Sequence, residues 1–185
     1  MKQSGGYCNM LEAIMAGENS SLSFASECLT GALLKLIETK RLDKISVTEL
    51  CEKAGVSRVT YYRNFSSVES ILVDYLKRAT DTWWQDFSLR HPEDPENFFW
   101  DELIAIYREN APVIKGIYES GMSSIVKEHL FSCCAVGTGG TVDDYRRAAL
   151  AGTIYGIIDL WIRQGMGDFP AGFNVRDYAA FSGQH

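Results

Sequence analysis

The stretch SVTELCEKAGVSRVTYYRN, residues 46–64, decides the fold that we predict for the first part of this chain. Ser46 can cap a short helix, and a glutamate three residues later completes the pattern of a capping box. Gly55 suits the left-handed turn that ends a helix, and Ser57 can cap the helix that follows. The two expected helices span residues 47–54 and 58–64. Two short helices joined by a tight glycine-containing turn are typical of a helix-turn-helix.

The two faces of this helix pair differ in character. The positions that must pack on each other and on a preceding helix are apolar: Val47, Leu50, Ala54, Val56 and Phe65. Within the second helix we expect Tyr61 to point inward and Tyr62 outward. The outward positions are polar, basic or aromatic: Arg58, Thr60, Tyr62, Arg63 and Asn64. A helix of this size fits the major groove of DNA and presents its first residues to base edges.

Hydroxyl groups near the expected helix N-termini add a second indication of DNA binding. They belong to Ser46, Thr48, Ser57 and Thr60, and such groups can hold phosphate oxygens. The alternative interpretation is a helical hairpin inside an unrelated bundle. The segment YYRNF at 61–65 favours DNA binding, because some of these aromatic and basic side chains must be exposed.

The spacing of apolar residues predicts helices along the rest of the chain. A first helix runs from Leu22 to Ile37, and a long fourth helix from about Val68 to Ser88. Further helices are expected over residues 96–110, 112–120, 122–131, 143–164 and 174–182. No segment reads as a strand, so the predicted fold class is all-α. We divide the chain into an arm (1–21), a helix-turn-helix DNA-binding domain (22–67) and a helical regulatory and dimerisation domain (68–185).

Charge is distributed unevenly along the 185 residues, whose formal net charge is −6. Residues 22–80 carry a net charge of +2, whereas residues 81–185 carry −7. An anionic partner such as DNA would favour the first region, and the acidic second region indicates a different partner.

The remaining composition excludes several classes of protein. Five cysteines without a CxxC pair and three well-separated histidines indicate neither a zinc module nor a secreted disulfide framework, so we expect no metal and no cofactor. The longest apolar stretch, residues 148–162, is too short to span a membrane, and no signal peptide is visible. We therefore expect a cytoplasmic protein. We expect no enzyme, because no catalytic triad can be assembled and the glycines at 137–140 lack the lysine of a phosphate loop.

Residues 33–72 resemble the N-terminal domain of the TetR/AcrR family of bacterial transcriptional regulators. The matching stretches are ISVTELCEKAGVS, TYYRNF and SSVESIL. The resemblance implies a three-helix DNA-binding domain followed by a ligand-binding, dimerising helical domain. By position, it implies backbone or groove contacts from Ser46, Thr48, Ser57, Thr60 and Tyr62. It implies contacts to base edges from Arg58, Val59, Tyr62, Arg63 and Asn64.

Two positions depart from the family pattern. Family members usually carry a lysine near the DNA backbone at the start of the fourth helix, where this chain has Val68. This departure puts one phosphate contact in question, not the fold. A small residue or glycine is common where this chain has Val59, whose side chain could instead touch the methyl group of a thymine.

The segment YGIIDLWIRQGM at 155–166 looks like the penultimate helix of many family members, which commonly forms half of a four-helix dimer interface. Two glycines four residues apart would allow close approach of two helices. We assign to the interface Gly152, Gly156, Ile158, Trp161, Ile162 and Tyr178. The alternative is that these residues form the core of a monomer. A two-fold dimer would bind a palindromic operator in double-stranded DNA, with recognition helices about 34–36 Å apart.

Aromatic residues are concentrated after residue 80, where they could line an effector pocket or pack the core. The candidate pocket residues are Trp83, Phe87, Tyr107, Tyr118 and Tyr155. Asp159 could contact an effector or accept a hydrogen bond at the interface. A redox role for the adjacent Cys133 and Cys134 is a further hypothesis.

Together these features predict a homodimeric, sequence-specific DNA-binding regulator, a repressor that a small-molecule effector releases from DNA. The alternatives are an activator, a DNA-binding member that lacks an effector response and has a protein partner, and an all-α enzyme. Binding to DNA with a steep salt dependence would favour a regulator, whereas turnover of a substrate would favour an enzyme.

Overall fold

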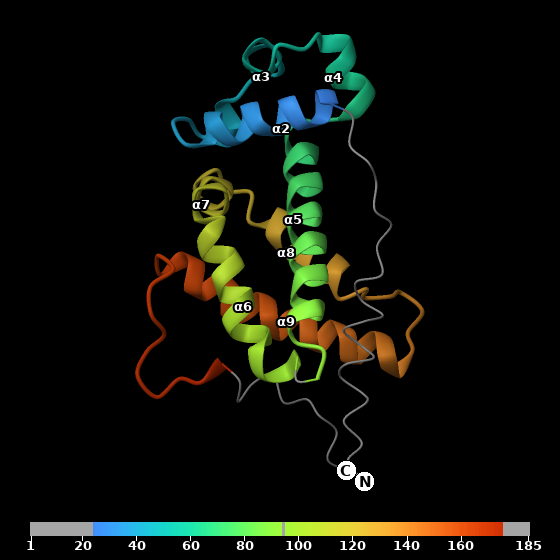
Figure 1. Ribbon diagram of the computed structural model, residues 1–185, viewed down its shortest axis with the longest axis vertical. Coiled ribbons are helices and arrows are strands. Elements are labelled where there is room, and N and C mark those ends of the chain that lie inside the picture. The colour runs from blue at the N-terminus through green and yellow to red at the C-terminus, as the bar shows by residue number, and fades with distance from the viewer. Residues whose placement is uncertain (1–23, 94, 176–185) are drawn as a thin grey trace. The chain divides into compact units, whose positions relative to one another are not determined.

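The computed structural model describes residues 24–93 and 95–175, which form helices and connecting loops without a strand (Figure 1). The all-α prediction is confirmed. The elements are α2 (Phe24–Ile37), the short 3₁₀ helix η1 (Leu42–Lys44), α3 (Val47–Ala54), α4 (Arg58–Asn64), α5 (Val68–Arg90), α6 (Pro95–Glu109), α7 (Ala111–Glu119), α8 (Ser124–Cys133) and α9 (Val142–Arg163). Each predicted helix before residue 165 is present, with ends that differ by a few residues. The predicted arm and most of the predicted last helix lie outside the described residues.

The chain forms two compact units. The N-terminal unit comprises the described residues 24–80 together with Asn110–Ile125, and the C-terminal unit comprises the described parts of 81–109 and 126–175. Helix α5 contributes residues 68–80 to the first unit and 81–90 to the second. Helix α7 therefore belongs to the same unit as the helix-turn-helix.

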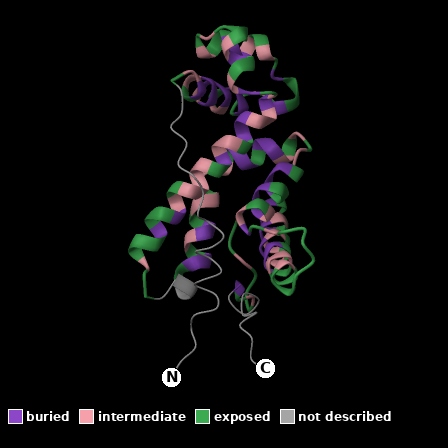
Figure 2. Ribbon diagram, turned by 90° about the vertical axis from the view of Figure 1, so that its right-hand side faces the viewer, coloured by how far each residue is buried: buried purple, intermediate pink, exposed green. Residues whose placement is uncertain are grey.

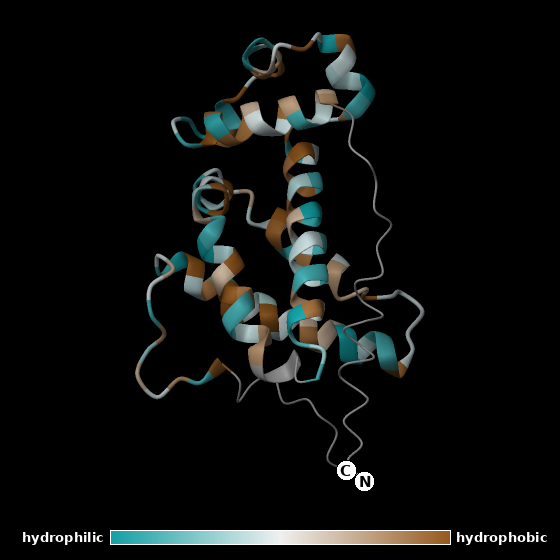
Figure 3. Cartoon of the chain, viewed as in Figure 1, coloured by the Kyte–Doolittle hydropathy of each residue, from teal (hydrophilic) through white to brown (hydrophobic). Residues whose placement is uncertain are grey.

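Within the N-terminal unit, α2 packs against α3, α4 and α7. Hydrophobic and hydrophilic residues alternate along α2 at helical spacing (Figure 3). Its buried side includes Leu29, Leu33, Leu36 and Ile37. These side chains provide the surface on which the two short helices rest, since neither is long enough to be stable alone.

The C-terminal unit is built around large aromatic and branched side chains from α5, α6 and α9. Its most completely buried residues include Phe87, Trp100 and Ile158. Helix α9 begins with a capping box, in which the Thr141 hydroxyl accepts from the Asp144 N–H and the Asp144 carboxylate accepts from the Thr141 N–H. These hydrogen bonds lower the pKa of Asp144.

Candidate nucleic-acid interface

The turn between α3 and α4 is fixed by local hydrogen bonds that the sequence predicts. The Ser46 hydroxyl accepts from the Glu49 N–H (3.2 Å), and α3 ends at Gly55 with φ of 67°. A residue with a Cβ is strained at this φ, which explains the glycine. The Ser57 hydroxyl then accepts from the Thr60 N–H (3.1 Å) and caps α4.

The inner side of the two helices is apolar and closed to solvent. Leu50, Cys51, Tyr61 and Phe65 are buried, and Tyr61 has no exposed surface. Burial raises the pKa of Tyr61 to about 12. Its hydroxyl finds no hydrogen-bond partner in the described part of the chain. The prediction that Tyr61 points inward and Tyr62 outward is confirmed.

The outer side of α4 presents four neighbouring side chains to solvent. They are Arg58, Val59, Tyr62 and Arg63. Tyr62 is 56% exposed and Val59 is 70% exposed. Positions 58 and 62, and 59 and 63, are one helical turn apart, so the four residues share one face. Figure 2 shows exposed residues in green on the outer turns of this part of the unit. We call these four residues the α4 face.

Two other residues predicted to contact DNA are engaged within the unit. The Thr60 hydroxyl lies 2.9 Å from that of Ser57. The Asn64 amide donates to the Thr60 carbonyl (2.7 Å), and its oxygen accepts from the Ser26 hydroxyl (3.1 Å). Asn64 therefore joins the end of α4 to the start of α2.

The predicted phosphate-binding residues at the helix N-termini are exposed. They are Ser46, Thr48 and Ser57. Val68, which stands where the family usually has a lysine, is buried at the start of α5. The position is thus part of the core of the N-terminal unit.

Polar contacts join the helix-turn-helix to its neighbours and hold the surrounding parts of the N-terminal unit together. Lys40, after α2, forms an ion pair with Glu49 in α3 (2.6 Å), which lowers the pKa of that carboxylate. The Ser120 hydroxyl accepts from the Leu42 N–H (2.9 Å). Tyr75 of α5 donates to the side-chain oxygen of Asn110, before α7. The sequence did not predict these roles of Ser120 and Asn110, because a single hydroxyl or amide carries no signal of a partner far away in the chain.

The predicted pocket residues fall in both units. Trp83, Phe87, Tyr107 and Tyr155 belong to the C-terminal unit, whereas Tyr118 belongs to the N-terminal unit. Phe87 is fully buried and its ring packs against that of Trp83, with 5.4 Å between centroids. The other members are partly exposed. Tyr155 donates to Asp159 (3.2 Å) in the next turn of α9, and its pKa is raised by burial and by that carboxylate.

The predicted interface residues lie on different sides of α9. Ile158, Trp161 and Ile162 are buried in the core of the C-terminal unit, so they pack within the chain. Gly152 and Gly156 are exposed, and a Cβ at either position would meet no atom within 4 Å. Tyr178 lies outside the described residues. The exposed glycines and the buried large residues of α9 share one helical period, so the sequence pattern did not distinguish the two faces.

The two cysteines of the predicted redox pair differ in their surroundings. Cys134 is buried, and burial raises the pKa of its thiol to about 11, which disfavours the reactive thiolate. The Cys133 sulfur lies 3.5 Å from Nε2 of His129, one turn earlier in α8.

The fold and the α4 face define a helix-turn-helix protein. The chain is 37% identical over 65 residues to the HTH-type transcriptional regulator EthR of Mycolicibacterium smegmatis (strain ATCC 700084 / mc(2)155). The match covers 34% of this chain and 30% of the relative, so it spans about a third of either protein. The match confirms the resemblance to TetR/AcrR regulators. The matched relative is a regulator and not an enzyme. No family model matches the chain. None of the described helices is long and apolar enough to cross a membrane.

Proposed function

We propose that this chain is a sequence-specific DNA-binding transcriptional regulator of the TetR/AcrR type, and that it acts as a repressor. The observation that carries the proposal is the α4 face, which exposes two arginines, a tyrosine and a valine on a capped helix after a tight turn. The similarity of 65 residues to a transcriptional regulator supports it. In this proposal α4 enters the major groove of double-stranded DNA.

Different side chains serve affinity and specificity. Arg58 and Arg63 supply charge-assisted donors that suit guanine O6 and N7, or phosphates. The exposed hydroxyls of Ser46 and Thr48 suit phosphate oxygens, whereas the Ser57 hydroxyl is hydrogen-bonded to Thr60. Thr60 and Asn64, which are engaged with Ser57 and Ser26, instead hold α4 in position.

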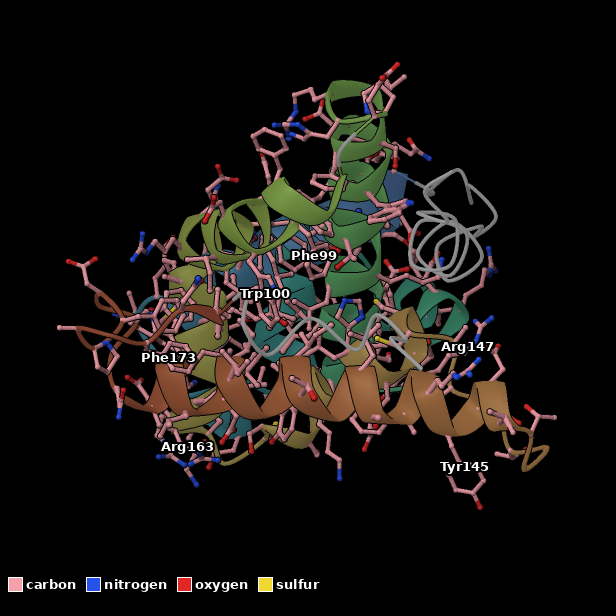
Figure 4. All side chains as sticks on the ribbon, turned by 90° about the horizontal axis from the view of Figure 1, so that it is seen from below. Phe99, Trp100, Tyr145, Arg147, Arg163 and Phe173 are labelled. Atoms are coloured by element: carbon pink, nitrogen blue, oxygen red, sulfur yellow. The ribbon has the colours of Figure 1, made fainter. Side chains whose placement is uncertain are left out.

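We propose that two copies associate through the exposed face of α9 and bind a palindromic operator. This face carries Val142, Tyr145 and Leu160, which are 69%, 73% and 57% exposed, as well as Gly152 and Gly156. In Figure 4 Tyr145 points away from α9, whereas Phe99 and Trp100 lie among the crowded side chains of the unit. Large apolar side chains at this exposure favour burial against a partner.

We propose that the C-terminal unit binds the effector. The indole N–H groups of Trp83 and Trp100 are buried, and neither has a hydrogen-bond partner within the described residues. Both rings contact Phe99, with centroids 6.0 and 5.7 Å away. An unsatisfied buried donor costs about 1–3 kcal/mol, which an effector with acceptor oxygens would recover. Helix α5 contributes to both units, so a shift of this helix would alter the placement of α4.

The DNA-binding proposal is tested by selecting binding sites from a random duplex library and measuring affinity by fluorescence anisotropy. We expect Arg63→Ala to weaken binding to the selected duplex at least about fivefold, because it removes one base-edge or phosphate contact. Arg41→Ala is the matched control, since this exposed arginine follows α2, at the opposite end from the contact with Asn64, and pairs with Asp43. Equal binding by wild type and Arg63→Ala would count against the role of the α4 face.

The dimer is tested by sedimentation. We expect Gly156→Trp to shift the protein toward the monomer, because an indole on the exposed face of α9 would hold two copies apart. Ala105→Trp, on an exposed position of α6, is the control. An unchanged sedimentation profile for Gly156→Trp would reject this interface.

A further inference from the structure

We propose that Val59 is a specificity-determining residue that recognises the C5 methyl group of a thymine in the operator. This inference rests on the proposed function and adds the base that one side chain selects. Val59 is the second residue of α4 and is 70% exposed, beside Tyr62 and Arg63 on the α4 face.

Neither packing nor helix formation within the chain explains a valine at this position. Its side chain is largely outside the core. Branching at Cβ restricts its rotamers and makes valine a poorer helix former than alanine, lysine or glutamate. On a seven-residue helix that exposes this site, the local free energy favours those residues instead. The apolar side chain therefore contributes most if something covers it.

The hydrogen-bonding groups around Val59 limit which groups of the DNA bases the α4 face can recognise. The Thr60 hydroxyl and the Asn64 amide are engaged within the N-terminal unit. The outward groups are then the donors of Arg58 and Arg63, the ring and hydroxyl of Tyr62 and the Val59 methyls. Among the groups that base pairs present in the major groove, the thymine methyl is the apolar one. Cytosine at the same place presents a bare C5–H, so Val59 favours thymine over cytosine.

The test removes one methyl group from the DNA and its partner from the protein. After binding-site selection from a random duplex library, each thymine is replaced in turn by deoxyuridine, which lacks only the C5 methyl. At one thymine in each half-site, we expect deoxyuridine to weaken wild-type binding about fourfold, the factor for exposing one methyl group. Val59→Ala is expected to bind the thymine and deoxyuridine duplexes equally at that position. A 5-methylcytosine placed there should bind wild type more tightly than cytosine does.

Val73→Ala is the matched control, because Val73 is also exposed but lies on α5. It should retain the preference for thymine over deoxyuridine. The proposal is overturned if wild type and Val59→Ala lose the same factor at every thymine, even though both bind DNA. That result leaves the proposed function intact. If wild type selects no sequence from the library, the proposed function and this inference both fail.

Discussion

Adding one methyl group at Gly116 would measure how tightly α7 is held against α2. Gly116 lies inside α7 and is buried. A Cβ at this position would overlap Cγ2 of Ile37, the last residue of α2, and would lie 3.7 Å from its Cβ. The overlapping atom is on a Cβ branch, so it moves aside only if χ1 rotates. Ile37 has one strongly preferred χ1 rotamer in a helix, which makes this rotation costly.

Two opposing effects set the size of the change. Replacing glycine by alanine inside a helix stabilises the folded state by about 0.5–1 kcal/mol. Overpacking a buried contact destabilises it by about 1–3 kcal/mol. We therefore expect Gly116→Ala to lower the free energy of unfolding by about 1–2 kcal/mol. Gly31→Ala, inside α2, is the control, because a Cβ there meets no atom within 4 Å. It should stabilise the protein by about 0.5–1 kcal/mol.

The assay is urea unfolding followed by far-UV circular dichroism, with amide hydrogen exchange to locate the change in α2 and α7. Tryptophan fluorescence would not report on this contact, because all four tryptophans lie in the C-terminal unit. Ile37→Leu removes the β branch at nearly constant volume, so it should restore most of the stability lost by Gly116→Ala. If Gly116→Ala is as stable as Gly31→Ala, the proposed overlap between α7 and α2 is refuted.

Four further substitutions test individual polar groups. Tyr61→Phe removes a buried hydroxyl without a partner among the described residues, so it should leave stability unchanged or increase it in urea unfolding. Tyr75→Phe loses a hydrogen bond and should cost about 1 kcal/mol in the same assay. A large loss of stability for Tyr61→Phe would contradict the argument that its hydroxyl is buried without a partner. Ser57→Ala removes the cap of α4 and should cost about 1 kcal/mol, with faster amide exchange confined to that helix; unchanged exchange would deny the cap its role. The pKa of Asp144 is lower in the folded state, so its carboxylate stabilises the fold above its unfolded pKa of about 3.9, and this contribution disappears as the pH falls through the folded value. The stability gap between wild type and Asp144→Asn should therefore be widest near neutral pH and shrink in acid, and a gap that does not vary with pH would show that the charge is unimportant.

Local chemistry explains why the helix-turn-helix could be predicted. Capping at Ser46 and Ser57 and the left-handed turn at Gly55 depend on residues within a few positions of each other. Helical spacing also decides which of two adjacent tyrosines faces the core. Such short-range rules act before any tertiary contact forms, so the sequence displays them directly.

Long-range pairing explains what the sequence did not predict. The Ser120 hydroxyl meets Leu42, 78 positions earlier, and Asn64 meets Ser26, 38 positions earlier. The hydroxyl of Ser120 or of Ser26, taken alone, is compatible with an exposed loop or helix end. On α9, the glycines face solvent and Ile158 faces the core, because an exposed stripe of small residues and a buried stripe of large ones share the same period. The sequence pattern shows the helical period but does not show which face of the helix packs against the core.

The residues that hold α4 in place differ from those exposed on the α4 face, and this difference determines how variants of the helix can be interpreted. A helix of seven residues is well below the length of about 12–15 at which isolated helices become stable, so its order depends on tertiary contacts. Those contacts come from buried Tyr61 on the inner side and from the Asn64 amide at the C-terminal end, and the Ser57 cap adds a local hydrogen bond at the N-terminal end. Val59 and Arg63 contribute to none of them. Substitutions on the α4 face can therefore change the recognised sequence while the helix remains folded, and a loss of DNA binding in such a variant reports a lost contact with DNA.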